Sequence, residues 1–133
     1  MREILFKAKI IDNGEWVEGS LLQTTAVSLK SFIVTSSCYT FDKWDWNECV
    51  QVDTDTICQY IGLKDKNGCK IWEGDIVRCA DTIGKVGWNE THLAYTILTN
   101  VKGKMQYYYL DESLSNCTEV IGNIFDNPDL LGE

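Results

Sequence analysis

His92 is the only histidine of the chain, so any Ser-His-Asp or Cys-His mechanism must pass through it. It lies in residues 91–99, where Leu93, Tyr95 and Ile97 alternate with other residues as they would on a β-strand. His92 then belongs to the face opposite those apolar side chains. A surface or half-buried strand position is therefore favoured over catalysis.

Four residues of the segment 62–78 imitate part of a calcium loop, namely Asp65, Asn67, Gly68 and Glu73. With Gly68 as the required sixth position, the first ligand would be Leu63 and the twelfth would be Gly74. Neither side chain has an oxygen to offer a cation. The loop therefore lacks two essential ligands, and no calcium site is predicted.

Other carboxylates stand close together at Asp53 and Asp55 and among Asp42, Asp45 and Glu48. Nothing in their spacing fixes the geometry that a hard cation needs. The chain also contains no GxxxxGK[ST] or GxGxxG run, so a dedicated nucleotide site has no support. We predict no catalytic residue, no metal and no cofactor.

Six cysteines are spaced without any C-x2-C pair, although zinc ribbons and fingers need paired ligands on one tight turn. The first residues are charged and alternating, unlike a secretory signal, and no apolar run reaches the roughly 18 residues of a membrane span. We therefore expect a cytoplasmic protein without a membrane partner, whose thiols are reduced and packed as small buried hydrophobes.

The net charge of −8 disfavours nucleic-acid binding, which depends on Lys and Arg neutralising phosphates. A candidate basic surface consists of Lys64, Lys66, Lys70, Arg78 and Lys85. Acidic residues such as Asp65 and Asp81 are interleaved with it and weaken it. A solvated face is the favoured interpretation of these side chains, and nucleic-acid binding is the alternative.

Trp44 and Trp46 form the one aromatic pair that polar residues surround, with Asp42 and Asp45 among them. Aromatic side chains ringed by polar groups are typical of protein interfaces. Two tryptophans at a spacing of two also pack on one face of a strand. Both interpretations stay open, and these four residues are the candidate protein interface.

Period-two alternation and β-branched content predict strands in most of the chain, while a turn of helix is expected only at residues 111–115 or after Pro128. The predicted strands cover residues 4–11, 15–19, 28–36, 47–52, 70–72, 75–80, 85–88, 93–99, 105–110 and 119–125, and residues 54–60 are ambiguous. We predict an all-β protein of small sheets or barrels. The weakest region for a boundary lies between residues 40 and 55, which gives domains of residues 1–53 and 54–133.

Residues 65–68 (Asp-Lys-Asn-Gly) predict a tight turn, either a two-residue loop on Asn67-Gly68 or a type I turn closed by a left-handed Gly68. Gly74-Asp75 then bends the chain into an apolar strand, and Gly84-Lys85-Val86 looks like the partner of that strand. This pattern is similar to the opening of small SH3-like barrels, which serve many functions.

Three blocks of sequence together resemble the YopX family of phage and prophage proteins. They are REILFKAKI near the N-terminus, TICQYIGLKDKNGCKIWEGDIV over residues 56–77 and EVIGNIFDNPDLL over residues 119–131. Family members usually carry Gly in place of Cys58, and Tyr or Phe in place of Trp72. The resemblance implies an all-β fold with an SH3-like C-terminal part, an origin on a phage or integrated element, and self-association.

The family signature consists of turn formers and strand neighbours, and we favour a structural role for them over a binding site. They are Gln59, Gly62, Leu63, Asp65, Asn67, Gly68, Glu73, Gly74 and Asp75. The resemblance implies no activity and transfers no catalytic residue. We expect a non-enzymatic accessory protein that binds a host or phage protein and can form a homo-oligomer. The alternative is a nucleic-acid-associated regulator that uses the barrel.

Overall fold

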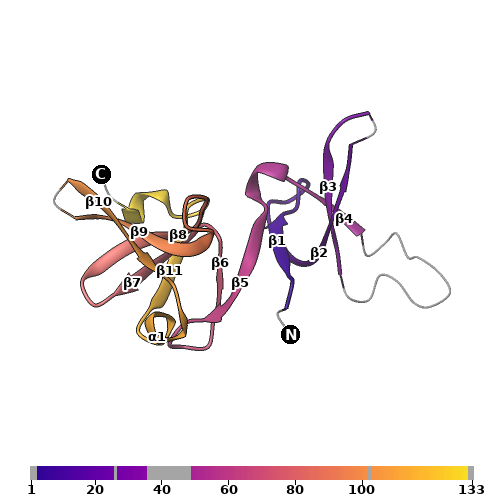
Figure 1. Cartoon of the computed structure of the whole chain (residues 1–133). Coiled ribbons are helices and arrows are strands. Elements are labelled where there is room, and N and C mark those ends of the chain that lie inside the picture. The colour runs from indigo at the N-terminus through magenta and orange to yellow at the C-terminus, as the bar shows by residue number, and fades with distance from the viewer. Residues whose placement is uncertain (1–2, 26, 36–48, 102, 132–133) are drawn as a thin grey trace. The chain divides into compact units, whose positions relative to one another are not determined.

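The computed structural model describes residues 3–25, 27–35, 49–101 and 103–131 of the chain. It divides into two compact units, residues 1–59 and 60–133 (Figure 1). Nearly all regular structure is antiparallel β-strand, and helix is confined to short turns. The predicted all-β class with little helix is confirmed.

The N-terminal unit is an antiparallel sheet in the order β4-β3-β2-β1-β5. Its strands are β1 (Phe6–Lys9), β2 (Trp16–Thr24), β3 (Lys30–Val34), β4 (Cys49–Val52) and the first residues of β5 (Cys58–Lys64). The residue after β1, Ile10, bridges to Val52 and so joins β4 to the other side of the unit. Ala8, Ile33 and Val52 form its buried core, and Phe6 packs against it. Ala8 and Phe6 belong to the apolar face that the alternation in residues 4–11 predicts, whereas Ile4 of that face is exposed.

Strand β2 runs to Thr24, whereas the sequence predicted a strand that ends at Gly19. Gly19 does not end the strand, because β3 approaches the chain closely there. A Cβ atom at this position would clash with the Val34 carbonyl and meet Ile33 at 2.9 Å. Glycine in a strand often marks such a close backbone approach, so it permits the pairing of β2 with β3.

The ambiguous residues 54–60 contain the 3-10 turn η2 (Thr54–Thr56) and the start of β5. The Asp53 side chain caps this turn by accepting the backbone N–H of Asp55. The structural division lies after Gln59, six residues beyond the predicted one after Asp53. The reason is that Cys58 and Gln59 still pair with β1 and belong to the N-terminal sheet.

In the C-terminal unit the remainder of β5 pairs with β6 (Lys70–Trp72), and a second sheet has the order β10-β9-β8-β7-β11. The strands of that sheet are β7 (Asp75–Cys79), β8 (Thr82–Asn89), β9 (Ala94–Val101), β10 (Lys104–Tyr109) and β11 (Glu119–Asn123). The helix α1 (Glu112–Ser115) and the 3-10 turn η3 (Pro128–Leu131) flank β11, where the sequence predicted turns of helix.

Strands β7, β8, β9 and β10 form an antiparallel meander in the second sheet. Strand β11 then pairs with β7 and becomes the other edge of that sheet. Apolar side chains of both sheets meet in the core of this unit, which contains Ile61, Ile71, Val77, Val86, Ile97 and Leu110. Burying branched aliphatic side chains of this kind drives folding by about 1.5–3 kcal/mol each. The SH3-like barrel itself stays a prediction.

Candidate functional site

The turn between β5 and β6 is built around the carboxylate of Asp65, which is 5% exposed. Its Oδ1 atom accepts the backbone N–H groups of Asn67 and Cys69, each at 2.9 Å. The N–H of Gly68 donates to the Asp65 carbonyl, and Gly68 has a φ of +82°. Of the two predicted turns, this is the one closed by a left-handed Gly68.

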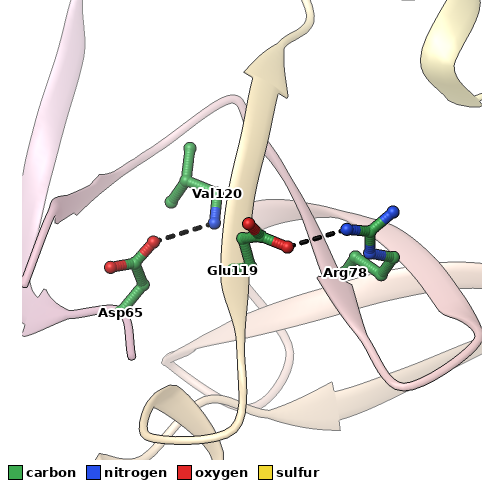
Figure 2. Close-up of polar contacts among 4 residues, drawn as sticks. All are labelled: Asp65, Arg78, Glu119 and Val120. Carbon is green, nitrogen blue, oxygen red and sulfur yellow. Dashed lines mark hydrogen bonds and ion pairs between the residues drawn. The ribbon is translucent and has the colours of Figure 1, made fainter. Parts of the chain in front are cut away.

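The other carboxylate oxygen of Asp65 ties this turn to β11. Oδ2 accepts the backbone N–H of Val120 at 2.9 Å (Figure 2), and the N–H of Lys66 donates to the Thr118 carbonyl. Burial alone pushes the pKa of Asp65 up. The bonds from Val120, Cys69 and Asn67 outweigh it, with help from the Lys66 charge, and hold the pKa below its usual value.

The second signature bend also serves the fold. The backbone of Gly74 donates to the Val86 carbonyl and accepts the N–H of Ile124, at a φ of +85°. The buried Asp75 carboxylate accepts the N–H of Trp72 at 2.9 Å. Because their hydrogen-bonding groups are engaged inside the protein, these signature residues do not offer an open ligand site.

The remaining signature residues lie on the strands and turns around these two bends. Gly62 is an exposed residue of β5, Leu63 packs against the core, Gln59 is half-buried and Glu73 is half-buried in the turn before β7. Gly62, Leu63 and Asp65 line a shallow, largely polar hollow together with Glu112 and Ser115.

The five residues of the candidate basic surface come from two places in the C-terminal unit. Lys64 pairs with Lys70 across the β5–β6 hairpin, and Lys66 lies in its turn. Arg78 and Lys85 lie on β7 and β8. Arg78 donates to Glu119 at 2.8 Å on the other side of β11 from Asp65 (Figure 2), so an acid already offsets its charge.

His92 lies in the turn between β8 and β9, so the predicted strand position was wrong. The Asn89 side chain accepts the backbone N–H groups of both Thr91 and His92, each at 3.0 Å. Leu93 then adopts a φ of +53°, which ends the turn before β9 begins. An Asn side chain that bonds the backbone two and three residues on favours a turn over a strand.

This turn places His92 beside two tyrosines of β10. The His92 Nε2 atom lies 2.7 Å from the Tyr107 hydroxyl, and its ring centroid lies 5.3 Å from Tyr107 and 5.7 Å from Tyr109. The two tyrosine rings meet edge to face at 6.0 Å. We call His92, Met105, Tyr107 and Tyr109 the aromatic surface.

The aromatic surface is open to solvent. Tyr107 is 44% exposed, Tyr109 52% and Met105 61%. The three residues alternate along β10, so they share one face of the sheet, and the ring contacts hold the tyrosines in place. From the sequence, Tyr107–Tyr109 were predicted only to form part of a strand. The alternation of Met105, Tyr107 and Tyr109 indicates that these side chains share a face of that strand. The position of His92 beside them is known only from the structure.

The aromatic surface offers apolar contacts and hydrogen bonds to a partner. His92 and Tyr107 share a hydrogen bond, but no described carboxylate or nucleophile completes a catalytic set with them. Within the described residues, no group of three His, Cys, Asp or Glu side chains could hold a metal ion. The predicted interface residues Trp44, Trp46, Asp42 and Asp45 lie outside the described residues.

The cysteines that the structure describes are less buried than the sequence predicted. Cys58 is buried, but Cys49 and Cys79 are half-buried, and Cys69 and Cys117 are exposed. The prediction of small buried hydrophobes was therefore wrong for the exposed pair. Cys69 follows the left-handed Gly68 in a surface turn, and Cys117 follows the short helix α1, where the chain runs along the surface.

An apolar pocket of about 140 Å³ opens on the other side of β10, beside Tyr108. Its walls include Val77, Ile97 and Leu114, and no charged residue lines it. A cavity of about 150 Å³ is large enough for a benzene ring. The pocket is thus a small gap in packing, whose polar groups are the Cys79 thiol and the hydroxyls of Thr82, Thr99 and Tyr108.

Comparisons with known proteins find one family whose model matches nearly the whole chain. The model of a family described as "YopX protein" matches residues 5–132. No curated protein matches the chain. It is similar to the crystal structure of protein EF1440 from Enterococcus faecalis, with 25% sequence identity, over 98% of this chain and 99% of that one, at a TM-score of 0.48. No helix in the described part of the chain is long and apolar enough to span a membrane.

Proposed function

This chain belongs to the YopX family, and on that premise we propose that it is a non-enzymatic accessory protein of phage or prophage origin that binds a host or phage protein. It acts in the cytoplasm of the bacterial host. The family names no reaction. The single observation that supports protein binding is the aromatic surface of the C-terminal unit.

Exposed tyrosines held in a fixed arrangement suit a protein interface. Tyrosine is enriched in interface cores, where its ring supplies apolar contact and its hydroxyl supplies a hydrogen bond. Tyr107 and Tyr109 are already positioned by each other and by His92. Binding therefore costs little side-chain ordering, which is about 0.5–1.5 kcal/mol for each flexible side chain immobilised.

The test is a pull-down from lysate of an infected host, with and without nuclease, using the full chain and two variants. Tyr107→Ser combined with Tyr109→Ser removes both tyrosine rings of the aromatic surface. Tyr108→Ser is the matched control, because Tyr108 is 47% exposed on the same strand but faces the other way. We expect a nuclease-resistant partner that the double variant loses and the control retains, with a loss of tenfold or more in affinity, about 1.4 kcal/mol.

Two results would contradict the proposal. The double variant could capture the same proteins as the wild type, which would remove the aromatic surface from any interface. Alternatively, every captured protein could vanish after nuclease treatment. That second result would support the other candidate function, a nucleic-acid-associated regulator.

One observation favours that second candidate. In the sheet, Lys85 pairs with Leu98, and Leu98 pairs with Tyr107, so a cation and an aromatic ring share one row across three strands. Single-stranded nucleic acids are bound by stacking of bases on aromatic rings beside a positive groove. We rank this function second because the net charge is −8 and Arg78 is paired with Glu119.

Salt-dependent binding would test this alternative directly. A labelled single-stranded oligonucleotide should bind more weakly as salt rises, and Lys85→Glu should reduce the salt slope by about one. Lys104→Glu is a control of equal charge, since Lys104 lies on β10 outside that row. No binding at low salt would exclude the nucleic-acid function.

A further inference from the structure

Strand β10 lies at an edge of the second sheet and pairs on one side only, with β9. Its register runs without interruption from Lys104 opposite Val101 to Tyr109 opposite Thr96. Beyond the strand, the N–H of Leu110 donates to the Tyr95 carbonyl at 3.1 Å. Within an antiparallel pair the residues that exchange hydrogen bonds alternate with those that do not.

The alternation decides which backbone groups of β10 are left over. Leu110, Tyr108 and Gln106 direct theirs to β9, and the Thr99 hydroxyl adds a bond to the Gln106 carbonyl. Met105 and Tyr107 therefore direct their N–H and C=O groups away from the sheet, as does Tyr109. No hydrogen bond from residues 3–25, 27–35, 49–101 or 103–131 reaches these outward groups.

The opposite edge of the same sheet is covered. Val120 of β11 donates to Asp65, and the carbonyl of Thr118 just before β11 accepts from Lys66. Further along, Asn123 donates to the Asn127 side chain. Proteins normally protect an edge with such cover, with proline, with a bulge or with charged side chains, especially Lys.

Among the described residues, only one of those protections is found at β10, the charge of Lys104 at its first position. All six of its residues are exposed, it contains no proline, its pairing with β9 shows no register shift, and Lys104 is its only charged residue. A regular, exposed and largely apolar edge is a template for pairing with another strand.

We infer that β10 pairs with β10 of a second copy of this chain, in the antiparallel direction and centred on Tyr107. In that register Tyr107 lies opposite Tyr107 of the partner copy, and Met105 lies opposite Tyr109. All three residues direct their backbone groups outward, so they are the ones that can exchange hydrogen bonds. The pairing is isologous, as expected for a two-fold dimer.

The charges at the two ends of β10 favour a second copy of this chain as the molecule that pairs with this edge. Lys104 stands at one end of β10, and Asp111 and Glu112 follow at the other. Antiparallel pairing about Tyr107 brings Lys104 of each copy to the acidic end of the other, because residue 104 lies opposite residue 110. The strand is thus complementary in charge to itself, whereas parallel pairing would bring like charges together.

This pairing also joins two aromatic surfaces. Tyr107 and Tyr109 lie on the same face of β10 as Met105, so the paired strands would present the rings of both copies on one continuous sheet. The inference does not depend on the proposed function, because a dimer forms whether or not another protein binds that face.

The decisive variant is Tyr107→Pro in the full chain, measured by sedimentation equilibrium over a range of concentrations. Proline removes an outward N–H that β9 does not use, and edge strands tolerate it at such positions. Tyr107→Thr is the matched control, since it removes the ring but keeps the N–H. We expect the wild type to reach the mass of a dimer, Tyr107→Pro to weaken the dimer at least about tenfold, and Tyr107→Thr to weaken it less.

A charge exchange tests the same register without proline, in case Tyr107→Pro fails to fold. Lys104→Glu should weaken the dimer, and adding Glu112→Lys should restore it. A wild type that stays monomeric at its highest soluble concentration would overturn the inference. So would a dimer that neither Tyr107→Pro nor Lys104→Glu weakens, because its interface would lie elsewhere. Partner capture in the pull-down is a separate readout, so a failure here leaves the proposed function standing.

Discussion

Replacing Asp65 by Asn tests whether its carboxylate holds the β5–β6 turn against β11. The carboxylate is 5% exposed and accepts three backbone N–H groups at 2.9 Å. Asn keeps one carbonyl oxygen, which still serves Asn67 and Cys69. Its amide nitrogen then faces the N–H of Val120, so a donor meets a donor in a buried place.

The expected loss in free energy of unfolding follows from these contacts. One bond to a charged acceptor is lost, the N–H of Val120 is left without an acceptor, and the two remaining bonds become neutral. Bonds to charged groups contribute about 1.5–3 kcal/mol, and an unsatisfied buried donor costs about 1–3 kcal/mol. We expect Asp65→Asn to lower the free energy of unfolding by about 2–4 kcal/mol.

The effect must depend on pH with a definite sign. The pKa of Asp65 is lowered in the folded protein, so the folded state favours the ionised carboxylate. The stability that it contributes is complete above the unfolded pKa of about 3.9. It is lost as the pH falls through the lower, folded pKa. Wild type and Asp65→Asn should therefore differ most near neutral pH and converge in acid.

Urea unfolding measured at a series of pH values checks both the size and the sign. Asp81→Asn is the matched control, because Asp81 is an exposed acid in the turn between β7 and β8. A loss below about 1 kcal/mol, or one equal to that of Asp81→Asn, would refute the role given to Asp65. So would a difference between wild type and Asp65→Asn that does not shrink in acid.

Four further substitutions make contrasting tests in the C-terminal unit. Gly84→Ala should lower the free energy of unfolding by about 3 kcal/mol or more, because its Cβ would lie 2.6 Å from the buried Ile97 side chain. Gly87→Ala on the same strand is the control, because its Cβ would meet nothing within 4 Å, and its effect should be near zero. Thermal unfolding compares the two variants. Gly74→Ala combines a φ of +85° with a contact at 3.4 Å and should cost about 1–2 kcal/mol in urea unfolding. Arg78→Ala should cost less than about 1 kcal/mol, since its ion pair with Glu119 is largely exposed, and a larger loss would contradict that interpretation.

Much of the local structure follows from the sequence, because strands and turns depend on near neighbours. The alternation in residues 105–110 predicts β10, and the segment 65–68 predicts a tight turn in one of two forms, of which the structure has the one closed by a left-handed Gly68. The same local rules failed at His92. Alternation in residues 91–99 predicted a strand there, but the Asn89 side chain captures two backbone N–H groups and holds a turn.

The sequence by itself determined the all-β class, most of the strands and membership of the YopX family. Only the tertiary structure decided what the key residues contact. Asp65 bonds Val120 across 55 positions, and His92 meets Tyr107 across 15. The exposed edge of β10 is likewise a property of strand order, which local propensity does not encode. Such contacts depend on how separate segments pack, so no pattern of neighbouring residues specifies them.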